Sequence, residues 1–331
     1  MSIWQDKQVL VTGAGGFIGS HLVELLASLG ARVRAMVHYN SRNDIGALRY
    51  LDGDLMGNVE VLQGEITDSG SVSQAVEGCD CVFHLAALIG IPYSYVAPRS
   101  YVATNISGTL NVLDAVRRCR TPRMVQTSTS ETYGTALYEP IDEKHPLQGQ
   151  SPYSASKVGS DKLAESYYLS FGTPVATIRP FNTFGPRQSA RAVIPTIIAQ
   201  LLAGKETVEL GSLTPRRDFT FVKDTARGFV AIAESDQCLG QVTNIGNGKA
   251  ITIGQLADTL VSLINPSAKV VSAESRIRPE GSEVMALICN GDKARELTGW
   301  SPEVSLEQGL QETIAFIREN LEKFNTDQYV V

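Results

Sequence analysis

KQVLVTGAGGFIGSHLVELLASLGARV, residues 7–33, combines a short apolar run, a glycine-rich turn and an amphipathic run with helical spacing. Gly13, Gly16 and Gly19 follow the spacing G-x-x-G-x-x-G. The missing side chains permit a tight turn, close approach of a pyrophosphate and close packing of a helix on a strand. Because the glycines follow a predicted strand, open a predicted helix and lead into a second predicted strand at 31–37, the stretch predicts a dinucleotide-binding site.

The end of the second predicted strand bears on the choice of dinucleotide. In such folds an acidic residue at this place binds the adenosine ribose hydroxyls and favours NAD. Here residues 37–40 are VHYN, without a carboxylate, and Ser41 and Arg42 follow within reach of a 2′-phosphate. Arg42 could equally be a solvated loop residue. The sequence leaves NAD and NADP both open, with the side chains slightly favouring NADP.

Strand-like and helix-like runs alternate along the first 180 residues, which is typical of a parallel sheet with helices on both faces. The predicted strands are 8–11, 32–37, 59–63, 81–84, 124–127 and 174–178. After residue 180 the pattern is irregular, with predicted helices near 192–203, 253–263 and 306–323. Two acidic residues, Asp68 and Asp224, are predicted to cap the helices that follow them. Ligands are expected at the carboxyl ends of the strands.

Composition excludes several classes of protein. The chain has 331 residues and a net charge of −6, which argues against a nucleic-acid partner. No apolar stretch approaches the roughly 20 residues of a membrane span, and the first residues, MSIWQDKQ, lack the apolar core of a signal peptide. The five cysteines have no metal-ligand spacing, so reduced structural thiols and no metal site are expected. We expect a cytoplasmic protein with no membrane partner.

SPYSASKVGSDKLAESYY, residues 151–168, places Tyr153 and Lys157 one helical turn apart. A free tyrosine has a pKa of about 10, so near neutral pH it needs a fixed positive neighbour before it can accept a proton. Positions i and i+4 lie on one face of a helix, which holds the lysine ammonium close to the phenol. A pair with this spacing also occurs by chance on solvated helices, so the interpretation depends on the other motifs.

Four motifs occur in order: TGAGGFIGS at 12–20, HLAA at 84–87, TNISGTLNVL at 104–113 and YSASK at 153–157. Together they resemble the extended short-chain dehydrogenase/reductases, and the resemblance covers nearly the whole chain. It implies a Rossmann domain at 1–180, to which 217–248 returns, and a smaller C-terminal α/β substrate-binding domain formed by 181–216 and 249–331. It also implies a tightly bound NAD(P) cofactor and a homodimer packed through helices near 99–118 and 153–170.

The resemblance assigns cofactor contacts to the glycine turn, the end of the second strand, a turn that could cover the adenine, the HLAA loop and YSASK. The residues are Gly13, Gly16, Phe17, Ile18, Gly19, His38, Asn40, Ser41, Arg42, Glu65, Ile66, Leu85, Ala86, Ala87, Asn105 and Lys157.

STSETYG, residues 128–134, bears on the reaction. In sugar epimerases of this superfamily the place of Glu131 usually has no carboxylate, whereas Thr, then Asp or Ser, then Glu resembles nucleotide-sugar 4,6-dehydratases. There the glutamate removes the proton at carbon 5, which becomes acidic once carbon 4 is a ketone. By this resemblance Glu131 is the base, Thr129 binds the substrate oxygen beside Tyr153, and Tyr153 with Lys157 performs the redox step.

Ser130 departs from the hexose-nucleotide dehydratases that have Asp at this place as the acid for the hydroxyl leaving carbon 6. Serine is a poor acid, so either Glu131 delivers that proton or Ser130 relays it through water. Thr-Ser-Glu resembles the guanosine-diphosphomannose dehydratases, but also nucleotide-sugar decarboxylases that act on glucuronates. A glucuronate decarboxylase and a 4-epimerase therefore stay open as alternatives.

LIGIPYSYVAPRSYVATN at 88–105 and RPFNTFGPRQSARAVIP at 179–195 resemble the legionaminic-acid-type dehydratases that act on nucleotide-linked N-acetylglucosamine. The implied reaction converts GDP- or UDP-N-acetylglucosamine to the 4-keto-6-deoxy sugar. The implied substrate residues are Tyr93, Ser94, Asn182, Arg187, Arg217 and Arg278, with Arg216 as a competitor of Arg217. Arginines suit the diphosphate because a guanidinium can bind it through two hydrogen bonds.

Overall fold

The computed structural model describes residues 2–273, 276, 281 and 283–324. Arg278, predicted to bind the nucleotide, lies outside the described residues. A seven-stranded sheet with the order β10-β6-β5-β4-β1-β2-β3 forms the larger part of the protein, and all its pairs are parallel. The strands are β1 (Gln8–Thr12), β2 (Arg32–His38), β3 (Val59–Gly64), β4 (Cys81–His84), β5 (Met124–Thr127), β6 (Val175–Pro180) and β10 (Val242–Ile245).

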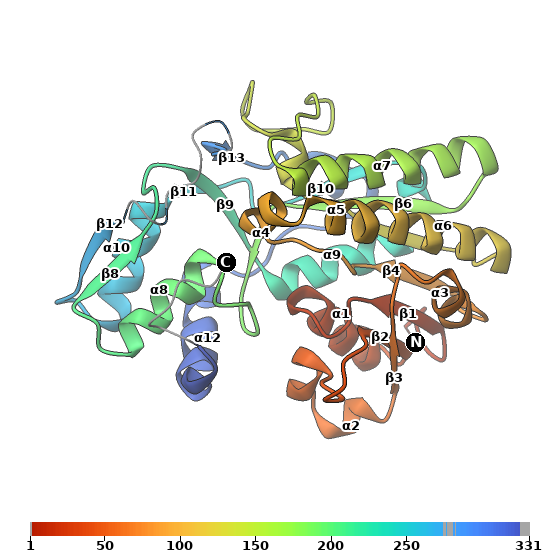
Figure 1. Cartoon of the computed structure of the whole chain (residues 1–331), viewed down its shortest axis with the longest axis horizontal. Coiled ribbons are helices and arrows are strands. Elements are labelled where there is room, and N and C mark those ends of the chain that lie inside the picture. Colours follow the sequence, from red (N-terminus) through yellow and green to blue (C-terminus); the bar gives the residue numbers. More distant parts are fainter. Residues whose placement is uncertain (1, 274–275, 277–280, 282, 325–331) are drawn as a thin grey trace.

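Helices cover both faces of this sheet because its strands are apolar on both sides. Val9 and Val11 of β1 belong to one buried cluster, and Leu10 between them belongs to another, as the two-residue repeat of a strand requires. The first cluster includes residues of α1 (Phe17–Ser28) and α9 (Val222–Glu234), and α11 (Asp292–Thr298) packs on α9. The second includes residues of α3 (Ser69–Val76), α6 (Gly108–Cys119) and α7 (Pro152–Phe171). The predicted doubly wound parallel sheet is confirmed (Figure 1).

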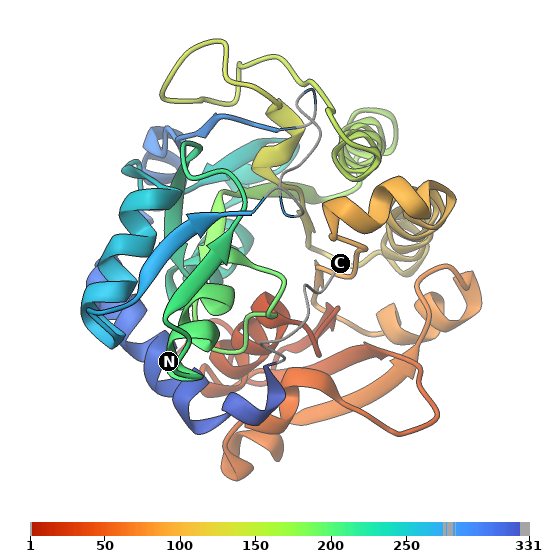
Figure 2. The ribbon, with the colours of Figure 1, turned by 60° about the vertical axis from the view of Figure 1, so that its left-hand side comes forward.

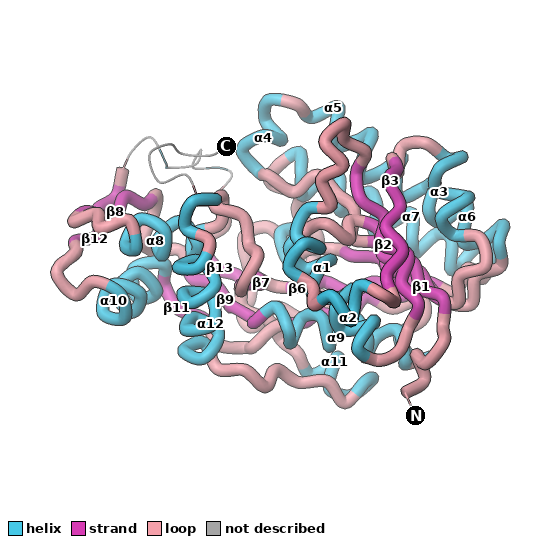
Figure 3. Tube along the Cα trace, turned by 90° about the horizontal axis from the view of Figure 1, so that it is seen from below, coloured by secondary structure: helices cyan, strands magenta, loops and turns pink. Residues whose placement is uncertain are grey.

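The C-terminal elements form a smaller α/β unit on the opposite side of the molecule from α6 and α7 (Figure 2). Its core joins β7, β8 and β9 to the three helices α8, α10 and α12. The elements are β7 (Asn182–Phe184), α8 (Val193–Leu202), β8 (Thr207–Leu210), β9 (Arg216–Phe221), β11 (Ala250–Thr252), α10 (Ile253–Ile264), β12 (Lys269–Ser272), β13 (Ala286–Leu287), α12 (Leu306–Glu319) and η7 (Leu321–Lys323). Figure 3 shows its strands β8 and β12 at the far end of the molecule from β1, β2 and β3.

The segment 217–248, predicted to return to the Rossmann domain, is divided between the two units. β9 pairs with β7, β11 and β13 of the smaller unit, whereas β10 pairs with β6 at the edge of the large sheet. Helix α9 lies between them in the chain and packs on α1. The chain thus crosses back to the large sheet at α9, and the domain limits stay a prediction.

Short elements complete the chain, and several of them carry loops of the site. They are η1 (Gly46–Tyr50), α2 (Gly53–Met56), α4 (Ile91–Val96), α5 (Pro98–Tyr101), the π-helical turn η2 (Val102–Ser107), η3 (Ser130–Tyr133) and η4 (Asp236–Cys238). The helices predicted to form a dimer interface, η2–α6 and α7, pack side by side in the monomer (Figure 1). Dimerisation itself stays a prediction.

Among the described residues, no helix combines the length and the apolar character that crossing a bilayer requires. A cytoplasmic location stays a prediction. The same described residues contain no group of three or more His, Cys, Asp or Glu side chains suited to a metal ion.

Candidate active site

A cavity of about 1050 Å³ lies at the carboxyl ends of β1, β2, β4, β5 and β6, where the C-terminal unit meets the large sheet. Most of the residues predicted for the site line it. They are Gly13, Gly16, Phe17, Ile18, Gly19, His38, Asn40, Arg42, Leu85, Ala86, Ala87, Thr129, Ser130, Glu131, Tyr153, Lys157, Asn182 and Arg217. This is the edge at which parallel α/β sheets bind ligands.

The glycine turn leaves no space for side chains. Gly13 has a φ of +70°, and a Cβ there would lie 2.7 Å from the backbone nitrogen of Ala86. A Cβ on Gly19 would lie 2.2 Å from the carbonyl oxygen of Gly13. The turn therefore packs directly on the HLAA loop while α1 begins immediately behind it, and the N-terminus of this helix offers a place for an anion. These contacts fit a dinucleotide.

His84 orders the HLAA loop from below and is buried. The Thr109 hydroxyl donates to the Asn105 carbonyl (2.7 Å), so it accepts from Nε2–H of His84 (3.1 Å). The Thr12 hydroxyl then donates to Nδ1 of His84 (2.8 Å) and accepts from the backbone N–H groups of residues 85 and 86, each at 3.1 Å. Burial lowers the pKa of His84 to about 3, so the ring is neutral and acts as a fixed connector.

Asn105 acts on the next part of the same loop. Its Oδ1 accepts from the backbone N–H of Leu88 (2.8 Å), and its Nδ2 donates to the carbonyl of Leu88 (2.9 Å) and to Oγ of Ser156 (2.9 Å). Asn105 is buried and does not line the cavity. It fixes the loop above the cavity, which differs from the predicted direct contact with the cofactor.

Tyr153 and Lys157 lie on the cavity face of α7, which begins with a Ser151–Ser154 capping box and Pro152. Burial raises the pKa of Tyr153, and a hydrogen bond with the Thr129 hydroxyl opposes that rise. Lys157 Nζ donates to the carbonyl oxygen of Thr127 (2.6 Å), and burial lowers the pKa of Lys157 from 10.5 to about 8. At neutral pH the lysine thus stays mostly charged, one helical turn from the phenol.

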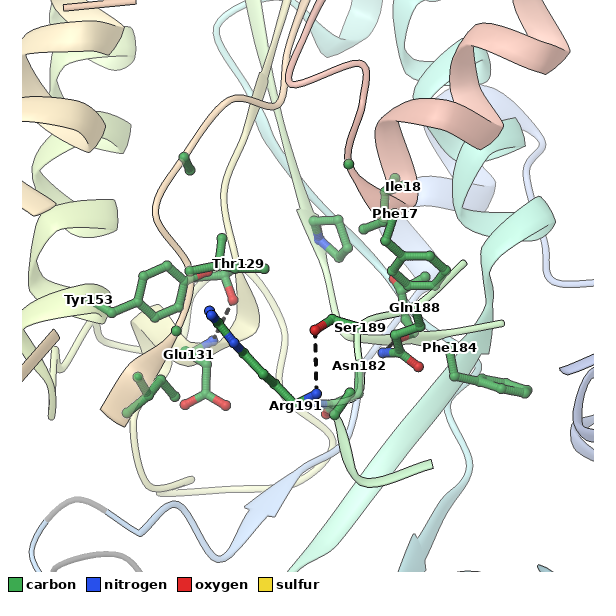
Figure 4. Close-up of a pocket in the computed structure, with 18 of the residues that line it drawn as sticks. Phe17, Ile18, Thr129, Glu131, Tyr153, Asn182, Phe184, Gln188, Ser189 and Arg191 are labelled. Atoms are coloured by element: carbon green, nitrogen blue, oxygen red, sulfur yellow. Dashed lines mark hydrogen bonds between the residues drawn. The ribbon is translucent and has the colours of Figure 1, made fainter. Parts of the chain in front are cut away.

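Glu131 points into the cavity near Tyr153 and Thr129 (Figure 4). Thr129 caps the short helix η3, and its hydroxyl accepts from the backbone N–H of Glu131 (3.3 Å). The negative charge of Glu131 contributes to the raised pKa of Tyr153, so the two groups interact electrostatically. Within the described part of the chain no ion pair engages this carboxylate.

Several predicted residues lie outside the lining: Ser41, Glu65, Ile66, Asn105, Tyr93, Ser94 and Arg187. Glu65 forms an ion pair with His38 (2.9 Å), and Ile66 is buried against α6 near Gly108. The Ser94 hydroxyl is buried and donates to the carbonyl of Ile91 (2.6 Å). Tyr93 lies against the ring of Tyr101, with 6.3 Å between the ring centroids. Contact of Tyr93 and Ser94 with the sugar stays a prediction.

Of the predicted arginines, Arg217 lies in the cavity and Arg187 does not. Arg187 is buried against α1, where it pairs with Glu24 (2.7 Å). Arg216, the competitor of Arg217, points outward and pairs with Glu139 (2.6 Å). Arg217 pairs with Glu283 (3.3 Å) at the cavity wall. Arg276, two residues before the predicted Arg278, also lines the cavity.

Four charged residues of the described cavity lining were missed from the sequence: Asp44, Arg191, Arg276 and Glu283. Asp44 lines the end that holds His38 and Arg42, because Oδ1 of Asn40 accepts from the backbone N–H groups of Arg42 (3.2 Å) and Asp44 (2.8 Å) and folds this loop back. Arg191 reaches the cavity from the loop before α8 and extends towards Glu131 and Tyr153 (Figure 4). The signals for Asp44 and Arg191 were a carboxylate four residues after Asn40 and an arginine in the segment GPRQSAR.

The match to known proteins covers nearly the whole chain. The family model described as GDP-mannose 4,6 dehydratase matches residues 10–313. The chain is 32% identical to the UDP-N-acetyl-alpha-D-glucosaminuronate decarboxylase of Bacillus cytotoxicus, over 95% of this chain and 98% of that protein. It is 33% identical to the dTDP-glucose 4,6-dehydratase of an Actinoplanes species, over 95% and 98% respectively.

Among solved structures, a double mutant of DesIV, a dTDP-glucose 4,6-dehydratase from Streptomyces venezuelae with NAD and DAU bound, superimposes with a TM-score of 0.85. It is 29% identical, and the match covers 94% of this chain and 97% of that one. The family resemblance inferred from the four motifs is confirmed. The chain belongs to the GDP-mannose 4,6 dehydratase family, among enzymes of the NAD-dependent epimerase/dehydratase type that act on nucleotide sugars.

Proposed function

We propose that this protein is a nucleotide-sugar 4,6-dehydratase that converts GDP- or UDP-linked N-acetylglucosamine to the 4-keto-6-deoxy sugar. The observation that supports this most is the Glu131 carboxylate in the same cavity as Tyr153 and Thr129. Oxidation at carbon 4 alone needs only the phenol, its lysine and a hydroxyl donor. A carboxylate beside them adds a base that can act on the neighbouring carbon once carbon 4 is a ketone.

Each residue has a defined proton step in this proposal. Tyr153, whose phenolate the ammonium of Lys157 one helical turn away would favour, takes the hydroxyl proton at carbon 4, and Thr129 orients that oxygen. When bound, a nicotinamide supplies the temporary store for the hydride that leaves carbon 4 and later enters carbon 6. Glu131 takes the proton at carbon 5 and passes it to the hydroxyl that leaves carbon 6 as water. The proton from the carbon 4 hydroxyl finally replaces the one lost at carbon 5, so atoms and charges balance.

Ser130 does not replace Glu131 in the acid step. Ser130 lines the cavity, but a serine hydroxyl is far too weak an acid to protonate a leaving group directly. Glu131 has the proton from carbon 5 at the moment when the hydroxyl departs. A single carboxylate that works first as base and then as acid therefore accounts for both transfers.

Arg191 favours a second candidate, decarboxylation of a nucleotide-linked uronate. A carboxylate on carbon 6 of the sugar would be a natural partner for a guanidinium that extends towards Glu131. Within residues 2–273, 276, 281 and 283–324, no acidic side chain forms an ion pair with Arg191. One relative at 32% identity is named as a decarboxylase of such a sugar. In this case carbon dioxide would leave in place of water.

A panel of nucleotide sugars, read by mass spectrometry, tests the proposal. We expect GDP- or UDP-N-acetylglucosamine to lose the mass of one water, with no net change in the cofactor. Loss of the mass of carbon dioxide from a nucleotide uronate would support the second candidate and overturn the first. Conversion without change of mass, detected as an epimer by chromatography, would leave Glu131 without a role in elimination and overturn both.

We further propose that the cofactor is NAD. Solved relatives contain NAD, and Asp44 places a carboxylate at the end of the cavity where the adenosine ribose is expected. Hydrogen bonds from Gly46 and Arg49 lower the pKa of Asp44, so this group is an anion at neutral pH and opposes a 2′-phosphate. This reverses the slight preference for NADP inferred from Arg42. Identification of the dinucleotide released by denaturing the purified protein decides it, and recovery of NADP alone would refute the role of Asp44.

A further inference from the structure

Behind the catalytic pair, α7 contains a third functional position that the reaction described above does not use. Tyr153, Lys157 and Asp161 follow one another at intervals of four residues, so they lie on one face of the helix. The side chain of Asp161 is only 3% exposed. Burying a carboxylate costs free energy of folding unless the group is paired and hydrogen-bonded. The contacts of Asp161 supply both kinds of partner.

Asp161 forms a buried triad with Arg179 of β6 and Ser128 at the end of β5. Its Oδ2 accepts from Nη2 of Arg179 (2.7 Å) and from the hydroxyl of Ser128 (2.5 Å). Nε of Arg179 also donates to the hydroxyl of Ser128 (3.2 Å), and the guanidinium lies over the ring of Tyr133, 4.6 Å from its centroid. The three side chains fix one another between α7 and the sheet.

The triad is connected to the reacting groups through the chain itself. Ser128 lies between Thr127, whose carbonyl accepts from Lys157, and Thr129, whose hydroxyl bonds to Tyr153. The second carboxylate oxygen of Asp161, Oδ1, is buried and has no hydrogen-bond partner among the described residues. The contacts of Asp161 therefore compensate its negative charge only in part. Lys157 lies one helical turn away, so its ammonium can interact with the remaining charge.

The charges that act on Lys157 come from three elements. Tyr153 and Asp161 lie one turn to either side of it on α7, His84 of β4 interacts with it but is neutral, and the cation Arg179 of β6 is paired with Asp161. Burial favours a neutral lysine, and Asp161 is the group that opposes it. The negative charge of Glu131 acts on Tyr153.

We propose that Asp161 is a positioning residue that keeps Lys157 an ammonium, with Arg179 and Ser128 holding its carboxylate in place. The inference rests on the Tyr153–Lys157 redox pair and not on which bond breaks afterwards. It therefore applies to a dehydratase and to a decarboxylase. Its test uses the first half of the reaction, the oxidation at carbon 4, so that failure of the proposed dehydratase activity and failure of this inference can be told apart.

Asp161→Asn removes the charge at nearly constant size, and its effect on the pH profile has a defined sign. Without the anion, Lys157 loses its proton at lower pH, so the alkaline limb of the oxidation rate moves to lower pH. Asp161 also raises the pKa of Tyr153, so the acid limb moves in the same direction. We expect a shift of about 1 pH unit in both limbs, as for a charge at this separation. The measurement is the pH dependence of the absorbance of reduced nicotinamide formed with the substrate that the panel identifies.

Two further variants separate charge from packing. Asp161→Glu keeps the charge, so its limbs should lie near those of the wild-type protein even if the melting temperature falls. Ser128→Ala removes one donor to the carboxylate, which disfavours its ionised form, so a smaller shift in the same direction is expected. If Asp161→Asn does not fold, the pH profile of Ser128→Ala decides whether Asp161 acts on Lys157. Limbs that stay in place while rate or melting temperature falls would overturn the inference and leave the triad a purely structural role.

Discussion

Glu131→Gln is expected to permit oxidation at carbon 4 but to stop the loss of water. Gln has almost the same size and keeps the backbone hydrogen bond that caps η3, because that bond uses the backbone N–H of residue 131 and the Thr129 hydroxyl. It cannot accept the proton at carbon 5. Loss of a general base costs roughly 10²- to 10⁴-fold, so turnover should fall by about 10³-fold. Reduced nicotinamide should accumulate on the enzyme, as absorbance spectroscopy would show.

A matched control for this variant is Glu139→Gln. Glu139 lies outside the cavity, where it pairs with Arg216 at the surface, so the same change of charge should leave turnover near the wild-type value. Exchange of the carbon 5 hydrogen with deuterated solvent gives a second readout, because Glu131 is the group expected to remove it. Full dehydratase turnover by Glu131→Gln, or undiminished exchange at carbon 5, would remove Glu131 from the mechanism.

Hydrophobic periodicity, capping residues and turn glycines act over a few neighbouring residues, and the parts of the structure that they determine could be predicted from the sequence. The predicted strands 81–84 and 124–127 agree with β4 and β5, and the other four predicted strands differ from β1, β2, β3 and β6 by one or two residues at their limits. Strand β10 was not predicted. Asp68 caps α3 as predicted, with its carboxylate accepting from Gly70 and Ser71. The glycine turn, Glu131, Tyr153 and Lys157 lie at strand ends or on one helix face, and this pattern together with the family resemblance placed them in the site that the cavity now forms.

The misplaced residues are those whose environment is set by elements distant in the chain. Arg187 is drawn to Glu24 of α1, more than 160 positions earlier, and no sequence spacing indicates that contact. Asp224 was predicted to cap α9, but it lies inside the first turn and accepts from the backbone N–H groups of Glu303 (3.1 Å) and Val304 (3.0 Å). It therefore connects α9 to the segment before α12, and the prediction of a cap is wrong.

Loops explain most of the remaining differences. The side-chain amide of Asn105 could bind a ligand, but in the structure it forms hydrogen bonds with the backbone N–H and carbonyl of Leu88. Asp44 and Arg191 were missed because both lie in loops. The Asn40 side chain folds the first loop back to the cavity, and the path of the loop before α8 brings Arg191 there. Loop paths depend on tertiary contacts, whereas strand and helix periodicity does not. Substrate choice depends on such loops, which is why the family could be predicted from the sequence whereas the substrate stays a proposal.

Tyr153→Phe is expected to abolish both halves of the reaction. The phenylalanine ring can keep the packing against Tyr101, whose ring centroid lies 6.3 Å away, so the fold should be retained. The variant lacks the oxygen that takes the hydroxyl proton at carbon 4 and leaves the Thr129 hydroxyl without that partner. We expect a loss of about 10⁴-fold, at the upper end for a general base, because the later steps cannot begin without the ketone. Tyr138→Phe, an exposed tyrosine outside the cavity, is the control.

The order of steps makes a stronger test than either variant alone. Elimination at carbon 5 requires the ketone at carbon 4, so Tyr153→Phe should hide the effect of Glu131→Gln. The double variant should form no reduced nicotinamide, which is also the result expected for Tyr153→Phe alone. The accumulation of reduced nicotinamide expected for Glu131→Gln should therefore be absent. Reduced nicotinamide in Tyr153→Phe, with substrate present, would show that another group accepts the hydroxyl proton. Exchange at carbon 5 in the same variant would show that Glu131 acts before oxidation, and the proposed sequence would have to be reversed.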